Sequence, residues 1–396
     1  MTDPTRTWVG LWVEQELLPG HPLLAQVVNG ALGIAALAVF ASLTAMFLVW
    51  LERKVSGHFQ LRLGPMRTGP HGILQTLADG LKLLFKEWFR PNTADPFTYY
   101  LAPFIPMTVS FLILAVLPFS PSLQIADPEL GIIYVAAVSG LGVLAILLGS
   151  WGSNNKYSLL GGLRAGAQAL SYEVSLLLCL LLIVLASGET SLSAIVESQT
   201  RLMPATAGGA AGAEPWFWHW WAVKLPVAGF IAFIIFLITS NAELNRSPFD
   251  TSEAESELAG GFHTEYSGIT FSMFFLAEYV NLFTAAALAS TLFLGGYLPP
   301  VPWLDFVPGV VWLMLKAYGI IFLFMWIRWT FPRLRIDQLI SLEWKFLLPV
   351  SLLNLVFAGG IVAVQGYMEQ RAAVEEEAQA TIEAPLPNHP TEGVQP

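Results

Sequence analysis

Three carboxylic acids lie inside or at the end of long apolar segments. Glu173 and Glu278 interrupt two such runs, and Glu243 ends a third. A charged side chain at the centre of a bilayer costs about 3 kcal/mol or more on insertion scales, so such residues face a helix bundle or a wet cavity. They often mark the routes of ions or protons. We therefore predict that Glu173, Glu243 and Glu278 belong to a proton path.

Glu278 also has a structural interpretation. Lys316 lies in a later apolar run, and an ion pair between Glu278 and Lys316 would lock two helices together without moving protons. Both interpretations stay open at the level of the sequence.

An acidic connection at 241–268 follows Glu243. Its acids crowd beside the single cation Arg246, and a string of carboxylates leading toward Glu243 and Glu278 is suited to carrying protons. Clustered carboxylates raise one another's pKa, so that some hold a proton near neutral pH. The alternative is a solvated surface. The acids of interest are Asp250, Glu253, Glu255 and Glu257.

Another charged connection follows the first apolar run. It begins with Glu52-Arg53 and continues through Arg62 to an amphipathic segment at 72–88 that carries Asp79 on its polar side. At about 100° per residue, the polar and apolar side chains of this segment fall on opposite faces of a helix. We predict a helix that lies in the membrane interface with its apolar face toward acyl chains or the bundle.

The elements that must position these residues are membrane spans. Of the 396 residues, 55% are hydrophobic and only 12% are charged, with a mean hydropathy of +0.60. The apolar runs are near the length that a helix needs to cross about 30 Å of hydrocarbon. We predict an all-α polytopic membrane protein with about eight transmembrane helices, at 29–51, 99–118, 132–151, 167–187, 222–241, 269–295, 308–330 and 345–367.

The distribution of basic residues predicts the orientation. The connections after the first, third, fifth and seventh spans carry 14 Lys and Arg residues, and the other side carries 3. By the positive-inside rule, the basic side is cytoplasmic and both termini lie outside. The predicted regions are an outside N-terminal segment at 1–28, the bundle at 29–367, and an acidic, Pro-containing tail at 368–396 that we expect to be disordered.

The chain has few residues that could bind a redox centre. Its single cysteine, Cys179, excludes a site made of several thiolates. None of the six histidines lies in the middle of a predicted span. We therefore expect no catalytic residue on this chain alone, no metal site and no bound redox centre.

Four sequence blocks resemble one protein family, the complex I subunit 1 family, whose bacterial members are the H subunits of the respiratory NADH–quinone oxidoreductase. The most specific block runs from Glu52-Arg53-Lys54-Val55 through Gly64-Pro65-Met66-Arg67 to Lys86-Glu87. The other three lie at 153–173, 243–279 and 328–339. Together they cover nearly all the connections on the basic side.

The resemblance implies a function. A member of this family is a membrane subunit that anchors the peripheral arm, forms the membrane side of the quinone chamber and couples quinone reduction to proton translocation. Part of its bundle resembles half of an antiporter subunit. The residues expected at the quinone chamber are Glu52, Arg53, Arg62, Asp79, Arg246 and Asp250. Those expected on the proton path are Glu173, Glu243, Glu253, Glu255, Glu257 and Glu278.

The resemblance also implies the surroundings. The substrate is a quinone, ubiquinone or menaquinone, and nothing is bound covalently; FMN and the iron–sulfur clusters belong to other subunits. The partners are the peripheral-arm subunits of the quinone site, the neighbouring small and antiporter-like membrane subunits and the lipid bilayer, with no nucleic acid. The location is the bacterial cytoplasmic (inner) membrane. The alternative is a membrane anchor of a related energy-converting hydrogenase complex without quinone. A free-standing transporter leaves the large charged connections unexplained.

Overall fold

The computed structural model describes residues 22–200, 215–252 and 255–383, and this part of the chain is helical. Seven of its helices are long and apolar enough to cross a membrane. This confirms a polytopic all-α membrane protein. The seven are α2 (Pro22–Phe59), α4 (Pro96–Val116), α5 (Gly131–Gly152), α6 (Lys156–Ser187), α11 (Gly268–Phe293), α12 (Gly309–Thr330), and a continuous helix formed by α13 (Ile336–Leu342), the π-helical turn η6 (Glu343–Leu347) and α14 (Leu348–Glu383).

The fifth predicted span, 222–241, is broken into two pieces. A single turn, α8 (Trp221–Lys224), is followed by the apolar helix α9 (Ala228–Glu243). Pro226 lies between them and cannot donate a backbone hydrogen bond, which ends a helix. The backbone then turns at Val227, whose φ is 67°. The break brings Gly229 against the α8 backbone, where a Cβ atom would lie 2.0 Å from the Trp221 carbonyl oxygen.

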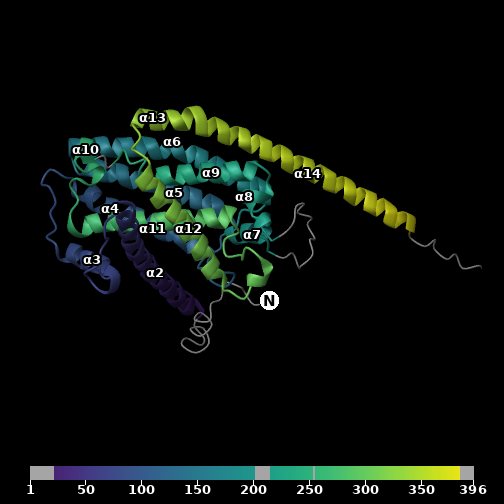
Figure 1. Ribbon diagram of the computed structural model, residues 1–396, viewed down its shortest axis with the longest axis horizontal. Coiled ribbons are helices and arrows are strands. Elements are labelled where there is room, and N and C mark those ends of the chain that lie inside the picture. The colour runs from purple at the N-terminus through teal and green to yellow at the C-terminus, as the bar shows by residue number, and fades with distance from the viewer. Residues whose placement is uncertain (1–21, 201–214, 253–254, 384–396) are drawn as a thin grey trace, which may run out of the picture.

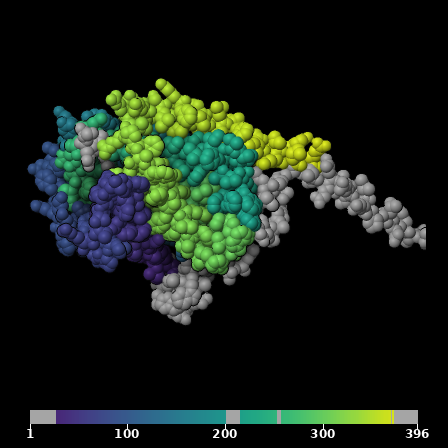
Figure 2. All heavy atoms as spheres, in the orientation of Figure 1, coloured from purple at the N-terminus to yellow at the C-terminus, as the bar shows by residue number. Residues whose placement is uncertain are grey.

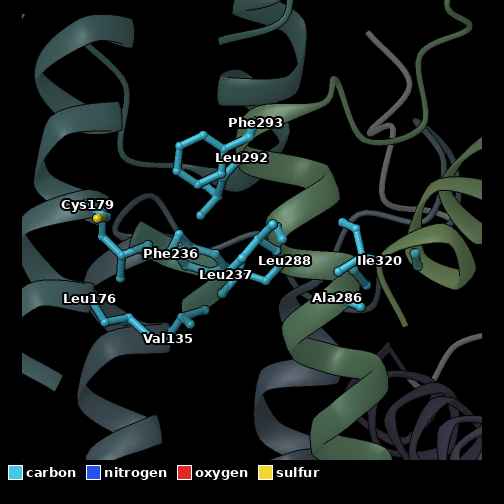
Figure 3. Close-up of a cluster of buried hydrophobic side chains, with 14 of the residues drawn as sticks. Val135, Leu176, Cys179, Phe236, Leu237, Ala286, Leu288, Leu292, Phe293 and Ile320 are labelled. Carbon is cyan, nitrogen blue, oxygen red and sulfur yellow. The ribbon is translucent and has the colours of Figure 1, made fainter. Parts of the chain in front are cut away.

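The core lies where the central spans converge. Val135 of α5, Leu176 of α6, Phe236 of α9 and Leu288 of α11 are all buried and belong to one apolar cluster. Figure 3 shows these side chains between their helices. Lipid tails are as apolar as these side chains, so the hydrophobic effect does not favour contacts between helices over contacts with lipid. Close packing of the side chains is therefore what holds the helices together.

The connections gather at two ends of the bundle. The short helices α3 (Gln75–Phe85) and α10 (Glu255–Leu258) lie at one end, which we call the charged end. The helices α7 (Leu192–Ser198) and α8 lie at the other (Figure 1). The charged end carries the connections after α2, α5, α9 and α12, in agreement with the predicted alternation of sides.

The amphipathic helix is shorter than predicted. The sequence pattern extends over 72–88, whereas α3 covers 75–85. A 3₁₀ turn, Pro70–Gly72, precedes it. Gly72 has a φ of +75°, and a Cβ atom there would lie 2.3 Å from the Pro65 carbonyl oxygen. This position therefore requires a glycine in a non-helical conformation, and the helix begins only after it.

The predicted tail is partly helical. α14 continues beyond the predicted end of the last span to Glu383 and projects from the body of the bundle (Figures 1 and 2). The stretch at 368–383 is rich in Ala, Glu and Gln, which favour helix, and the expected disorder of the tail stays a prediction. The remaining tail at 384–396 and most of the N-terminal segment lie outside the described residues.

Candidate functional site

Four charged side chains form an ion-pair cluster at the charged end: Glu52, Arg246, Glu278 and Arg328. Arg246 contacts Glu52 Oε2 through Nη1 and Glu278 Oε1 through Nη2, both at 3.0 Å. The second carboxylate oxygen of Glu52 accepts from Arg328 at 2.5 Å. The cluster thus joins α2, the connection after α9, α11 and α12. Its two acids and two bases balance, and one guanidinium is shared by both acids.

Arg246 is almost completely buried, with only 3% of its side chain exposed. Burial alone lowers the pKa of Arg246, but Glu52 and Glu278 outweigh it and raise the pKa above its usual value. Its guanidinium carbon also lies 4.6 Å from the centre of the Tyr279 ring, within the range of a cation–π interaction. Arg246 is therefore a permanent buried positive charge.

The connection that carries Arg246 is tied to its neighbours by hydrogen bonds. Gln168 of α6 donates through Nε2 to the Ala242 and Phe249 carbonyl oxygens, at 2.8 and 2.7 Å. Its Oε1 accepts from Thr251 at 2.7 Å. Further along, the buried Asp250 pairs with Arg333 at 3.0 Å. These bonds fix the backbone of the connection that carries Arg246 relative to the spans.

A cavity of about 160 Å³ runs from Glu278 to Glu243 between the central spans. A water molecule needs only ~15 Å³ of such volume and two or more polar partners. The cavity therefore has room for several water molecules. Polar side chains occur along its wall: Ser139, Ser240, His263 and Asn281, besides the two glutamates.

Glu173 lies beside this line of acids. One of its carboxylate oxygens lies against Gly140 of α5, 2.8 Å from where a Cβ atom would stand. Gly140 directly follows Ser139, which lines the cavity. The structure therefore brings Glu173, Glu243 and Glu278 into one region, with the cavity joining the last two.

Lys316 does not pair with Glu278; the ion pair of Glu278 is with Arg246 instead. The ammonium group instead donates to three backbone carbonyl oxygens and lies 4.6 Å from the centre of the Trp220 ring. The carbonyls, at 2.7, 2.9 and 2.7 Å, are those of Leu294, Gly296 and Leu298. The chain after α11 turns through Gly295 and Gly296, both with positive φ, and this turn directs the carbonyls at Lys316.

Arg53 and Asp79 form a second polar contact at the charged end. Arg53 contacts Asp79 at 2.5 Å, and Gln75 donates to the other carboxylate oxygen at 3.0 Å. Burial by itself raises the pKa of Asp79, but these two hydrogen bonds outweigh it and lower the pKa. The pair joins α3 to α2. Exposed apolar side chains lie on α3 beside it: Leu77, Leu81, Leu84 and Phe85.

The other predicted residues lie apart from these groups. Arg62 is exposed and bonds to Gln60 at 2.6 Å. Glu257 pairs with Arg164 at 2.7 Å and is 60% exposed, so it faces outward rather than toward the cavity. Glu253 is outside the described residues, and only the backbone of Glu255 is described, at the start of α10.

Sequence reasoning missed two cations of this site. Arg328 lies in the last turn of α12 and Arg333 in the connection after it. Basic residues at such positions are usually read as interfacial flanks. Two signals in the sequence pointed to them: both lie in the family-like block at 328–339, and the residues singled out had an excess of acids over bases, which calls for additional positive charge.

The fold and the site define a class: an α-helical membrane protein with a buried, charge-balanced ion-pair cluster beside a line of membrane acids. Residues 32–359 match the family model described as NADH dehydrogenase, and the chain belongs to this family.

Curated relatives agree, and their names describe them as H subunits of NADH-quinone oxidoreductase. One from Bacteroides thetaiotaomicron is 44% identical over 89% of this chain and 96% of its own length. One from Brevibacillus brevis is 48% identical over 81% and 90%. One from Geobacter sulfurreducens is 44% identical over 83% and 93%. These relatives do not favour the hydrogenase alternative.

Proposed function

We propose that this chain serves as the membrane-embedded H subunit of a proton-pumping NADH–quinone oxidoreductase and that the ion-pair cluster couples quinone reduction to proton movement. The observation that supports this most directly is that one guanidinium, Arg246, is shared by Glu52 and Glu278. Glu278 in turn lines the cavity that reaches Glu243.

The coupling follows from this sharing. Reduction of a quinone near Arg53 and Glu52 creates transient negative charge, which attracts nearby cations. If Arg246 shifts away from Glu278, that acid loses its positive partner, and protonation becomes the favoured way to neutralise it. Water in the cavity would carry the proton between Glu278 and Glu243. Glu173 extends the line toward neighbouring membrane subunits.

The quinone side of the proposal rests on α3. The Arg53–Asp79 contact and the exposed apolar side chains of α3 lie next to each other. A quinone has an apolar tail and a polar headgroup, and small-molecule sites of this kind combine apolar walls with a few polar groups. We expect α3 and the end of α2 to border the opening of the quinone chamber, with Glu52, Arg62, Arg246 and Asp250 further along it.

The charged end is also the proposed docking surface for the peripheral arm. Its connections at 52–90, 241–268 and 331–345 are large, and several of their apolar residues are exposed, including Leu61 at 97% and Leu63 at 82%. We propose that this end faces the cytoplasm and that both termini lie outside the bacterial inner membrane. Cross-linking of the intact complex should join these connections to peripheral subunits. Cross-links restricted to the opposite end would contradict the orientation.

The test of coupling is to replace Glu278 and Glu243 separately by Gln, which keeps the shape but removes the titratable proton. In the assembled complex, reconstituted in liposomes, we expect quinone-linked NADH oxidation and proton pumping to fall by about a hundredfold. NADH oxidation by a hydrophilic artificial acceptor should persist, because it bypasses the membrane part.

The matched control is Glu129→Gln, an exposed acid at the opposite end, which should behave like the wild type. Wild-type pumping by both Glu278→Gln and Glu243→Gln would show that these acids only stabilise the bundle.

A further inference from the structure

Asp250 and Arg333 form an ion pair that the proposed coupling does not use. Asp250 Oδ2 lies 3.0 Å from Arg333 Nη2. The carboxylate is buried, whereas 47% of the arginine side chain is exposed. Asp250 belongs to the connection after α9, and Arg333 belongs to the connection after α12. The pair therefore joins two segments that are far apart in the sequence.

A backbone hydrogen bond joins the same two connections. The N–H group of Leu334, the residue after Arg333, donates to the Pro248 carbonyl oxygen at 3.0 Å. We call this bond and the Asp250–Arg333 pair the loop junction. The ion pair is the part of the loop junction that a side-chain substitution can remove while the backbone groups stay in place.

Tyr172 of α6 contacts both sides of the loop junction. Its ring packs edge-on against that of Phe249, with the ring centres 5.7 Å apart. Its hydroxyl group donates to the Leu339 carbonyl oxygen of α13 at 3.0 Å, and the side chain is completely buried. Gln168, which lies one turn earlier on α6, donates to the Phe249 carbonyl oxygen. Both connections therefore rest on the same membrane helix.

Both connections also determine where the cations of the ion-pair cluster lie. Arg246 shortly precedes Pro248 in the first connection, and Arg328 lies in the last turn of α12, just before the second connection. The two guanidinium groups bond to different oxygens of Glu52, at 3.0 and 2.5 Å. Bonds between arginine and carboxylate depend on direction as well as distance. Two guanidinium groups meet on one carboxylate only if both connections are held in register.

We propose that Asp250 is a positioning residue that acts through Arg333: it holds the two connections together, so that Arg246 and Arg328 meet on Glu52. This rests on the proposed coupling function. Loss of the ion pair loosens the loop junction, and the guanidinium groups no longer share Glu52 in a fixed geometry. The alternative role for Asp250 is direct contact with quinone in the chamber, and the two roles predict different kinetics.

The experiment is a double-mutant cycle in the assembled complex, with a short-chain ubiquinone or menaquinone as the acceptor. Asp250→Asn and Arg333→Gln should each lower kcat about tenfold and leave KM for the quinone near its wild-type value. The double variant should also lose about tenfold, rather than the hundredfold or so that two independent losses give, because each single change already breaks the same pair. Arg333→Lys keeps the positive charge and should restore most of the turnover.

A second measurement reports on the loop junction without using activity. The Leu334 amide is bonded to the Pro248 carbonyl oxygen, so its hydrogen exchange should be faster in both single variants and in the double variant than in the wild type. Arg164→Gln is the matched control, because it breaks an exposed ion pair at the same end. It should leave kcat and the exchange of the Leu334 amide at wild-type values.

The outcomes separate this inference from the proposed function. Losses that multiply in the double variant, together with a raised KM in Asp250→Asn alone, would make Asp250 a quinone contact and overturn the inference. Wild-type exchange of the Leu334 amide in the three variants would also overturn it, because the ion pair would then not hold the loop junction. Normal pumping by Glu278→Gln would overturn the proposed function instead, while a non-additive cycle with faster Leu334 exchange would still support the loop junction.

Discussion

Two regions of the molecule bury positive charge in different ways. At the charged end, Arg246 contacts two carboxylates and an aromatic ring. At the opposite end, Lys316 donates to three backbone carbonyls. The carbonyls belong to the turn after α11 and cannot take up or release a proton. The carboxylates can, so the partners of Arg246 are able to change their charge, whereas the partners of Lys316 are not.

Lys316 has a structural role, in contrast to the ion-pair cluster around Arg246. The hydrogen bonds of Lys316 use all three of its N–H groups and close the end of α11, the helix that carries Glu278 at its other half. Lys316 therefore holds α11 in place, and the movable charges lie at the charged end. Variants of the ion-pair cluster should therefore affect both the stability and the activity of the complex, whereas variants of Lys316 should affect its stability alone.

The largest expected effect is that of Arg246→Ala. It leaves the buried Glu52 and the partly exposed Glu278 without their shared cation, and removing one partner of a buried ion pair typically costs 3–5 kcal/mol, here about 4 kcal/mol. We expect the complex to lose subunits or to dissociate at a clearly lower temperature in a thermal melt. Arg164→Ala is the matched control, because its pair with Glu257 is exposed, and it should change the melting temperature little. Equal stability of both variants would contradict the assigned balance of charge.

A smaller effect is expected for Lys316→Met. It leaves three carbonyls without their donor, at a cost of about 3 kcal/mol, so the melting temperature should fall. The turnover of each complex that still assembles, and its pH profile, should stay at wild-type values. Lys224→Met is the control for loss of a lysine at the same end, where Lys224 donates to the Ser198 carbonyl oxygen at 3.1 Å, and it should lower the melting temperature less. A shifted pH profile in Lys316→Met would show that Lys316 takes part in coupling, and the comparison would fail.

The sequence predicted the spans well because apolar run length is a local property. It also found most members of the ion-pair cluster, since charges next to apolar runs are conspicuous. It did not predict their pairing, because Glu52 and Arg246 are 194 positions apart. The Lys316–Glu278 pairing was wrong for a related reason. The carbonyls around Lys316 are arranged by positive-φ glycines, whose turn is not visible in a pattern of side chains.

Arg53→Ala and Asp79→Leu test a second contact at the charged end, outside the ion-pair cluster. Each removes the contact between α2 and α3, and we expect quinone-linked activity to fall about tenfold through misplacement of α3. Oxidation of NADH by an artificial acceptor should persist. Labelling by a photoreactive quinone should fall on residues 52–88 in the wild type and weaken in both variants. Labelling confined to other parts of the chain would refute the position of the chamber opening.

The smallest expected effect is the pH dependence of the Arg53–Asp79 contact. The pKa of Asp79 is lower in the folded chain than in the unfolded chain, so the contact contributes its full stability above the unfolded value of about 3.9 and loses it as pH falls through the folded value. Both side chains are partly exposed, at 42% and 36%, which limits the contribution to less than about 1 kcal/mol.

Hydrogen exchange at the α3 amides should therefore accelerate slightly on acidification in the wild type, after correction for the intrinsic pH dependence of exchange. In Asp79→Asn the amides should be less protected at neutral pH, and their corrected exchange should not vary over that range. If the two proteins show the same protection at every pH, α3 is held by its apolar contacts alone.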